Sequence, residues 1–179
     1  MIIPSDTPVQ NRHLLELKSA LGLKTYQWIF VFGLTPTKWA KMAQDARQTL
    51  LSGQIVRDPR IALLARWLDV HPDQLPDILG LQPEAFYRAF CQANRRLTLR
   101  EFSLLLGCHE TAGYRWVTKG SPAAPIVTNI LSILCTDTAP TLVGNWINWR
   151  SMAIEEARLR GIPNLLSIGS WQTPTKAAA

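Results

Sequence analysis

Polar and charged side chains gather in the second half of the stretch 97–120, LTLREFSLLLGCHETAGYRWVTKG, directly after a glycine. In a helix starting there, one outward side would carry His109, Glu110, Thr111, Tyr114 and Arg115. Such side chains donate and accept hydrogen bonds in the geometry that nucleobase edges and phosphates require. This chemistry favours recognition of a nucleic acid.

Those side chains need two short helices that cross at a tight turn, and the same stretch contains the parts. Thr98 is a candidate cap for the first helix, and Ser103 is small where the second helix would cross it. Gly107 suits the left-handed backbone that such a turn requires. The residues expected to anchor both helices to a core are Leu106, Cys108 and Trp116.

The stretch resembles the helix-turn-helix of the Cro/repressor-type (XRE-like) DNA-binding family, in which sequences of the form LTxxxLAxxLGVSxxTIxxW recur. The segment LTLREFSLLLGCHETAGYRW matches this form at Leu97, Thr98, Leu106, Gly107 and Trp116. The resemblance implies an all-α fold whose second helix enters the major groove of double-stranded DNA. A following helix, 125–134, also fits the family pattern.

Two positions depart from the family pattern. Leu99 stands where a phosphate-contacting glutamine is common, and Gly113 stands where a branched apolar residue is usual. Glycine there costs on the order of 1 kcal/mol in helix propensity. We expect either that Trp116 or Phe102 fills the space or that the helix bends.

The resemblance assigns roles to individual residues. The side chains that would read bases are His109, Glu110, Thr111, Tyr114 and Arg115, of which Arg115 also suits a phosphate. The side chains placed for backbone phosphates are Arg95, Arg96, Arg100 and Lys119. The alternatives are a solvated helix face for the basic residues and a helix cap for His109.

An internal repeat emerges when Gly33 is set on Gly107. GLTPTKWAKM then lies over GCHETAGYRW, and PRIALLARWL (59–68) lies over PIVTNILSIL (125–134). In this first copy Thr35 can cap the second helix, and Thr37, Lys38 and Lys41 fall on its outward face.

The first copy differs at the crossing, because Ile29 replaces the small residue and the helix YQWIFVF is apolar nearly all round. We expect that helix to be buried on more than one side. The unit either binds DNA through Lys38 and Lys41 or serves as a structural platform.

Composition bounds the protein class. The chain has 179 residues, 47% of them apolar, with a net charge of +6 and a pI of about 9.6, which suits an anionic partner. Cys91, Cys108 and Cys135 lack metal-ligand spacing, so we expect reduced, buried thiols and neither a disulfide framework nor a metal site. No signal peptide or membrane-spanning run is recognised, which predicts a cytoplasmic protein.

Helical periodicity dominates, so we predict an all-α protein of two tandem helix-turn-helix bundles with a C-terminal helical extension. The predicted units are 1–82, 83–139 and 140–179. Apolar residues of the last unit either pack back on the core or form a homodimer interface, and they are Ile162, Leu165, Leu166, Ile168 and Trp171.

No phosphate loop, nucleophile elbow or carboxylate cluster is present, so we predict neither an enzyme nor a cofactor. The prediction is a sequence-specific regulator of transcription that binds double-stranded DNA, of bacterial or mobile-element origin, with repression favoured because occluding a promoter needs no further machinery. The alternative is a protein-interaction adaptor that uses the same scaffold without touching DNA.

Overall fold

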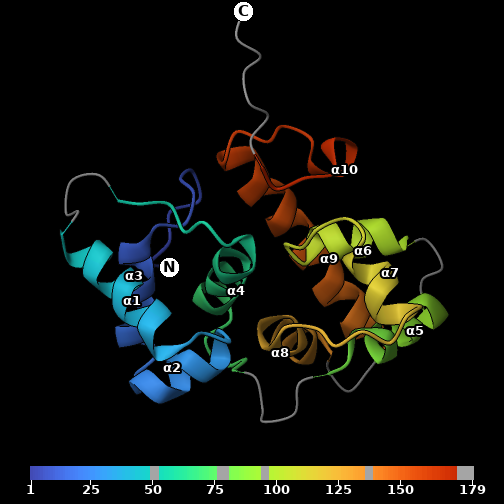
Figure 1. The fold of residues 1–179 in the computed structure, drawn as a ribbon, viewed down its shortest axis with the longest axis horizontal. Helices are drawn as coiled ribbons and strands as arrows, with labels where there is room; N and C mark the ends of the chain where they lie inside the picture. Colours follow the sequence, from blue (N-terminus) through green and yellow to red (C-terminus); the bar gives the residue numbers. More distant parts are fainter. Residues whose placement is uncertain (49–52, 76–80, 94–96, 136–138, 173–179) are drawn as a thin grey trace, which may run out of the picture.

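The computed structural model describes residues 1–48, 53–75, 81–93, 97–135 and 139–172, and within these ranges the regular elements are α-helices, with one isolated β-bridge between Gln10 and Ile55. The predicted all-α class is confirmed (Figure 1). The helices are α1 (Asn11–Ala20), α2 (Thr25–Val31), α3 (Pro36–Gln48), α4 (Pro59–Val70), α5 (Pro83–Ala93), α6 (Leu99–Leu105), α7 (Ala112–Val117), α8 (Pro125–Leu134), α9 (Ala139–Leu159) and α10 (Leu165–Ile168).

Two successive sets of four helices, α1–α4 and α5–α8, follow the same order. The second helix of each set, α2 or α6, has seven residues. Each is followed by one cap residue and then by a glycine with positive φ, 56° at Gly33 and 73° at Gly107. The fourth helix of each set starts with a proline, Pro59 or Pro125. This order agrees with the alignment of the two glycines.

Each of these glycines lies against the other set of helices. A Cβ atom on Gly33 would come within 2.8 Å of the Ile126 nitrogen, and one on Gly107 within 2.9 Å of the Arg60 nitrogen. Ile126 and Arg60 both follow the leading proline of their helix. Both turns therefore require glycine for two reasons, the positive φ angle and the close approach of a helix from the other set.

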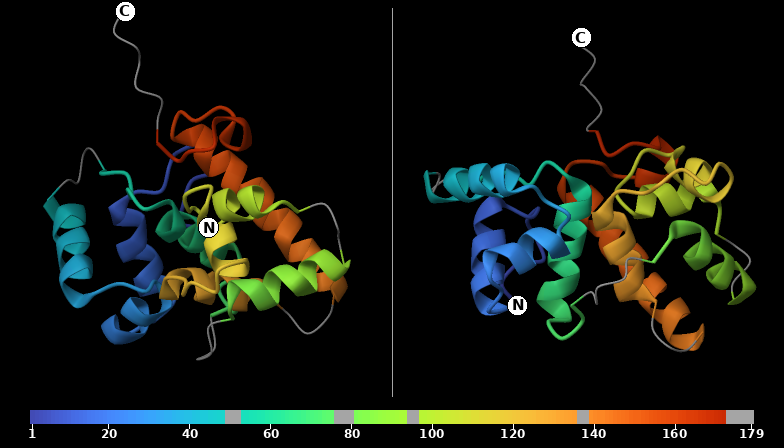
Figure 2. Two further views of the ribbon diagram at one scale, coloured as in Figure 1. Left: turned by 45° about the vertical axis from the view of Figure 1, so that its right-hand side comes forward. Right: turned by 60° about the horizontal axis from the view of Figure 1, so that its bottom comes forward.

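One continuous core joins the segments predicted as separate units. Helix α9 runs diagonally through the molecule and contacts α4 as well as α5, α6 and α8 (Figures 1 and 2). Its Trp149 is fully buried, lies 5.7 Å from the Trp67 ring and donates a hydrogen bond to the Leu105 carbonyl at 2.9 Å. This tryptophan thereby ties α4 to the end of α6.

The C-terminal segment packs back on α6 and α9, as one of the two alternatives predicted. Ile162 and Leu165 are each 1% exposed in a cluster with Leu104 and Ala157. The Trp171 indole nitrogen donates a hydrogen bond to the Leu104 carbonyl at 2.7 Å. These contacts account for most of the apolar residues in this segment, and a homodimer through it stays a prediction.

A buried carboxylate anchors the N-terminal segment. Glu156 is 0% exposed and accepts hydrogen bonds from Arg66 at 2.6 Å and from Arg160 at 2.8 Å. Arg66 also donates to the carbonyl oxygens of Pro4 and Thr7. The acidic group on α9 therefore holds α4 and residues 4–7 together.

The three cysteines form no disulfide, but the expectation that they are buried is wrong. Cys91 and Cys108 are half-buried and Cys135 is exposed. Cys135 ends α8, where the helix leaves the core. Burial raises the pKa of the Cys108 thiol to about 11, so this thiol stays protonated at neutral pH.

Candidate nucleic-acid interface

The close crossing of α6 and α7 depends on two small residues. The Gly113 nitrogen donates a hydrogen bond of 2.6 Å to the Ser103 hydroxyl, which donates to the Leu99 carbonyl at 2.7 Å. A Cβ atom on Gly113 would come within 2.5 Å of that carbonyl. No gap needs filling by Trp116 or Phe102, because α6 itself occupies the space.

The crossing fixes which side of α7 faces outward. Ala112, Gly113 and Trp116 are buried, whereas Tyr114 is 47% exposed and Arg115 is also exposed. The Lys119 ammonium lies 5.9 Å from the centre of the Tyr114 ring, within cation–π range. Aromatic, guanidinium and ammonium groups thus share this surface.

Three of the candidate base-reading residues lie in the turn before α7 and not on the helix, because α7 begins only at Ala112. His109 Nδ1 accepts a hydrogen bond from the Thr111 nitrogen at 3.3 Å and lies 3.0 Å from the Thr111 hydroxyl. His109 therefore bonds within the turn ahead of α7, and α7 itself has no side-chain cap. Both side chains are exposed at the surface.

Glu110 and Arg100 are engaged with each other. Arg100 donates to the Glu110 carboxylate at 2.7 Å and to the Leu166 carbonyl at 2.6 Å. A Cβ atom on Gly169 would meet the same carboxylate at 2.9 Å. The pair forms a seam between α6 and the C-terminal segment. Their contacts with DNA stay predictions, and Arg95 and Arg96 lie outside the described residues.

In the first set of helices, α3 exposes the residues expected on its outward face, Thr37, Lys38 and Lys41. The Thr35 hydroxyl accepts a hydrogen bond from the Lys38 nitrogen at 3.2 Å, as expected of a cap. Helix α3 has 13 residues against six in α7, and its last turn adds the exposed Arg47. Arg47 went unnoticed in the sequence, and it lies about half a turn round α3 from Lys38, beside Lys18 and Trp39.

The crossing of α2 and α3 is built from large residues. Ile29 and Trp39 hold the positions that Ser103 and Gly113 hold in the second set. Trp39 is 7% exposed, and its ring lies 5.5 Å from Trp28. Aromatic packing thus replaces the direct backbone approach seen between α6 and α7.

Helix α2 is buried on one side only, so the expectation of burial on more than one side is wrong. Trp28 and Val31 are buried, but Tyr26 is 66% and Phe30 49% exposed. The helix lies at the edge of the molecule (Figure 1), where no described segment covers its outer side. Apolar residue types alone did not reveal this position in the fold.

Asp58 joins the two outward surfaces. Its Oδ2 lies 3.5 Å from the Lys38 ammonium on α3 and 2.8 Å from the Arg60 guanidinium on α4. Burial alone raises the pKa of Asp58, but the hydrogen bonds and charge of Arg60, with the charge of Lys38, outweigh it and lower that pKa.

Arg60 in turn reaches the second set of helices. It lines a pocket of about 420 Å³ together with His109 and Arg115. The sequence did not single out Arg60, because only its packing against Gly107 brings it near α7. A polar surface therefore runs from α3 across the start of α4 to α7.

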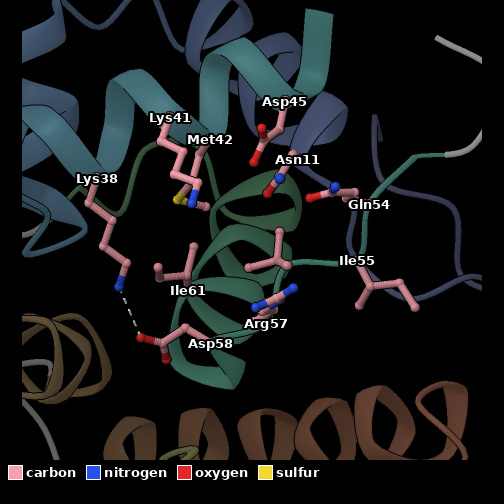
Figure 3. Close-up of a pocket in the computed structure, with 11 residues that line it drawn as sticks. Asn11, Lys38, Lys41, Met42, Asp45, Gln54, Ile55, Arg57, Asp58 and Ile61 are labelled. Atoms are coloured by element: carbon pink, nitrogen blue, oxygen red, sulfur yellow. Dashed lines mark ion pairs between the residues drawn. The ribbon is translucent and has the colours of Figure 1, made fainter. Parts of the chain in front are cut away.

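A second pocket, of about 380 Å³, lies between α3 and the start of α4 (Figure 3). Its lining includes Lys38, Lys41 and Arg57. Lys41 follows Gly33 at the same distance along the chain as Arg115 follows Gly107. The two pockets thus place a cation at equivalent positions, each in front of a proline-led helix.

Within the described ranges, no group of three histidine, cysteine or acidic side chains is placed to hold a metal ion. None of the helices in those ranges has the length and apolar character needed to cross a bilayer. The described surface therefore offers cations, amides, hydroxyls and one exposed aromatic ring around α3 and α7.

No family model, curated protein or solved structure matches this chain.

Proposed function

We propose that the protein is a sequence-specific regulator of transcription that binds double-stranded DNA in the cytoplasm through the outward faces of α7 and α3. The observation that carries the proposal is the direct contact of α6 and α7 at Ser103 and Gly113. This contact leaves Tyr114 and Arg115 on an exposed helix that follows a glycine turn. Helix-turn-helix proteins present their groove-binding side chains in this manner.

The charge distribution supports the proposal. The net charge is +6, and the exposed cations Lys38 and Lys41 lie on the outward face of α3. Arg115 and Lys119 contribute two more at α7. Cations that neutralise phosphates release counterions from DNA, which gives affinity that falls steeply with salt.

The α7 and α3 surfaces are assigned different contacts with DNA. Tyr114 and Arg115 are the base-contacting candidates on α7, with Thr111 at its start, and Lys119 and the lysines of α3 are placed for phosphates. Because both groups of contacts belong to one folded chain, the DNA site should be longer than the stretch that a single helix contacts. Repression follows when such a site overlaps a promoter.

The test is the affinity of the purified chain for mixed-sequence duplex DNA, measured by fluorescence anisotropy at increasing salt. We expect binding at low salt and weaker binding after Arg115→Ala with Lys119→Ala. Lys24→Ala with Arg88→Ala removes the same charge from α5 and the start of α2 and serves as the control. Absence of binding at low salt refutes the proposal. Selection of bound duplexes from a random pool then gives the recognised sequence and its length.

A second candidate is an adaptor that binds another protein and no DNA. The exposed Tyr26 and Phe30 of α2 favour it, because aromatic side chains are enriched at protein interfaces. Under this function, Tyr26→Ala with Phe30→Ala abolishes partner capture, and the α7 variants leave it unchanged.

A further inference from the structure

We propose that the pocket between α3 and α4 binds a small organic anion that carries an amino or amide hydrogen-bond donor. The pocket measures about 380 Å³, within the range of roughly 300–1,000 Å³ that is typical of ligand sites. Its walls come from α1, α3, α4 and residues 54–58. Binding at this site does not require that the protein also bind DNA.

Cations supply the groups for the anionic part of the ligand. Lys38, Lys41 and Arg57 all line the pocket and all are exposed enough to reach a ligand (Figure 3). Two carboxylates, Asp45 and Asp58, line the same pocket, and Lys38 faces Asp58 at 3.5 Å, so the cations exceed the carboxylates by one. A carboxylate or phosphate group of the ligand would lie nearest Lys41 and Arg57.

An unpartnered acceptor supplies the group for the donor. Asn11 is 7% exposed, and its Oδ1 atom is buried without a hydrogen-bond partner. The Asn11 side chain points toward the pocket beside Gln54 (Figure 3). A buried carbonyl oxygen without a partner destabilises the folded chain. An N–H group of a ligand in the pocket would satisfy it.

The pocket also has apolar walls. Met42, Ile55 and Ile61 line the same pocket, and Ile61 belongs to the core. Apolar walls with a few convergent polar groups are the usual composition of ligand sites. The ligand therefore combines an anionic group and a hydrogen-bond donor with apolar or aromatic surface.

A regulatory consequence follows, and it rests on the proposed function. Lys38 and Lys41 line the pocket and also belong to the α3 face assigned to DNA phosphates. A bound anion would neutralise them and compete with DNA. Ligand binding and DNA binding are therefore measured separately, so that either can fail alone.

The test is calorimetric titration of the full chain, without DNA, using adenosine monophosphate and L-glutamate as probes. We expect at least one probe to saturate a single site below about 10 mM. That probe should bind about tenfold more tightly than its analogue without the amino group, which is purine riboside monophosphate for adenosine monophosphate and glutarate for L-glutamate. Lys41→Ala should weaken the site by a similar factor. Lys24→Ala, a cation outside the pocket, should leave it unchanged.

Asn11→Leu separates ligand binding from folding. Because leucine removes an acceptor that has no partner, the melting temperature should stay equal or rise while binding of the probe falls about tenfold. Equal binding by Asn11→Leu and by the original chain would overturn the proposal. Failure of both probes to saturate the site below 10 mM would also overturn it.

Discussion

Ser103 and Gly113 hold α6 and α7 in direct contact through a hydrogen bond of 2.6 Å from the Gly113 nitrogen to the Ser103 hydroxyl. The same hydroxyl donates to the Leu99 carbonyl, one turn earlier on α6. The glycine that departs from the family pattern is therefore the partner of the small serine. The pair determines how far α7 stands from α6 and which way Tyr114 and Arg115 project.

Gly113→Ala should destabilise the protein. The added methyl group would lie 2.5 Å from the Leu99 carbonyl and 2.8 Å from the Ser103 hydroxyl. Overpacking of this kind costs about 1–3 kcal/mol in the free energy of unfolding. Chemical denaturation measures that free energy.

Gly144→Ala is the matched control for this prediction. Gly144 lies within α9 and has open space around the position of a Cβ atom. Alanine there should stabilise the protein by about 0.5–1 kcal/mol through helix propensity. Equal effects of the two substitutions would show that the close crossing is absent in solution.

Gly107→Ala should cost more stability than Gly120→Ala. Both glycines have positive φ, 73° and 64°, so each alanine adds about 1–2 kcal/mol of backbone strain. Only Gly107 also faces a neighbour, the Arg60 nitrogen at 2.9 Å, whereas Gly120 has open space. The difference between the two variants in denaturant midpoint measures the contact between the helix sets. No difference would argue against that contact.

The sequence predicted the helices and their caps well, because these depend on local residue types. Thr98 and Thr35 both cap the helices for which they were proposed. Local patterns could not predict contacts between distant segments. The exposure of Phe30 depends on where α2 lies at the edge of the fold, and the position of Arg60 depends on Gly107 in the other set of helices.

The candidate site was predicted in part for the same reason. The outward placement of Tyr114, Arg115 and the lysines of α3 follows from helical spacing. The pairing of Glu110 with Arg100 does not, because it involves the C-terminal segment as well. The late start of α7 reflects the hydrogen bond between Thr111 and His109, which holds the preceding residues in a turn.

Glu156→Gln should be among the most damaging substitutions on α9. It removes the only carboxylate that Arg66 and Arg160 are seen to contact within the described part of the chain, at 2.6 and 2.8 Å. Breaking a buried ion pair by removing one partner costs about 3–5 kcal/mol. Glu155→Gln is the control, since Glu155 pairs with Arg158 at the surface. A thermal midpoint for Glu156→Gln equal to that of Glu155→Gln would contradict the prediction.

His13 should make stability fall as the pH drops below about 6.5. Burial, with the charge of Arg12, lowers the pKa of His13 below its ordinary value of 6.5. Its Nδ1 accepts a hydrogen bond from the Gln10 nitrogen at 3.2 Å, which requires an unprotonated atom. The unfolded chain takes up a proton first as the pH falls, so stability is complete above 6.5 and is lost below it.

Urea denaturation at pH 7.5 and pH 5.5 checks this dependence. The difference in unfolding free energy between the two pH values should shrink in His13→Asn, because asparagine does not titrate. His71→Asn replaces another histidine, half-buried at the C-terminal end of α4, and serves as the control. A His13→Asn variant with an undiminished difference would assign the pH dependence to other groups.

The relative contributions of α3 and α7 to DNA binding can be separated by charge reversal. Lys38→Glu with Lys41→Glu changes two exposed cations of α3, and Arg115→Glu with Lys119→Glu changes two at α7. Each lost phosphate contact should reduce the slope of log affinity against log salt by about 0.9.

If both helices bind one duplex, each pair of substitutions removes a different part of the protected footprint on a selected sequence. A footprint unchanged by the α3 substitutions would restrict DNA contact to α7 and make the first set of helices a structural platform. Protection lost entirely with the α7 substitutions, but only shortened with those of α3, would identify α7 as the source of sequence specificity.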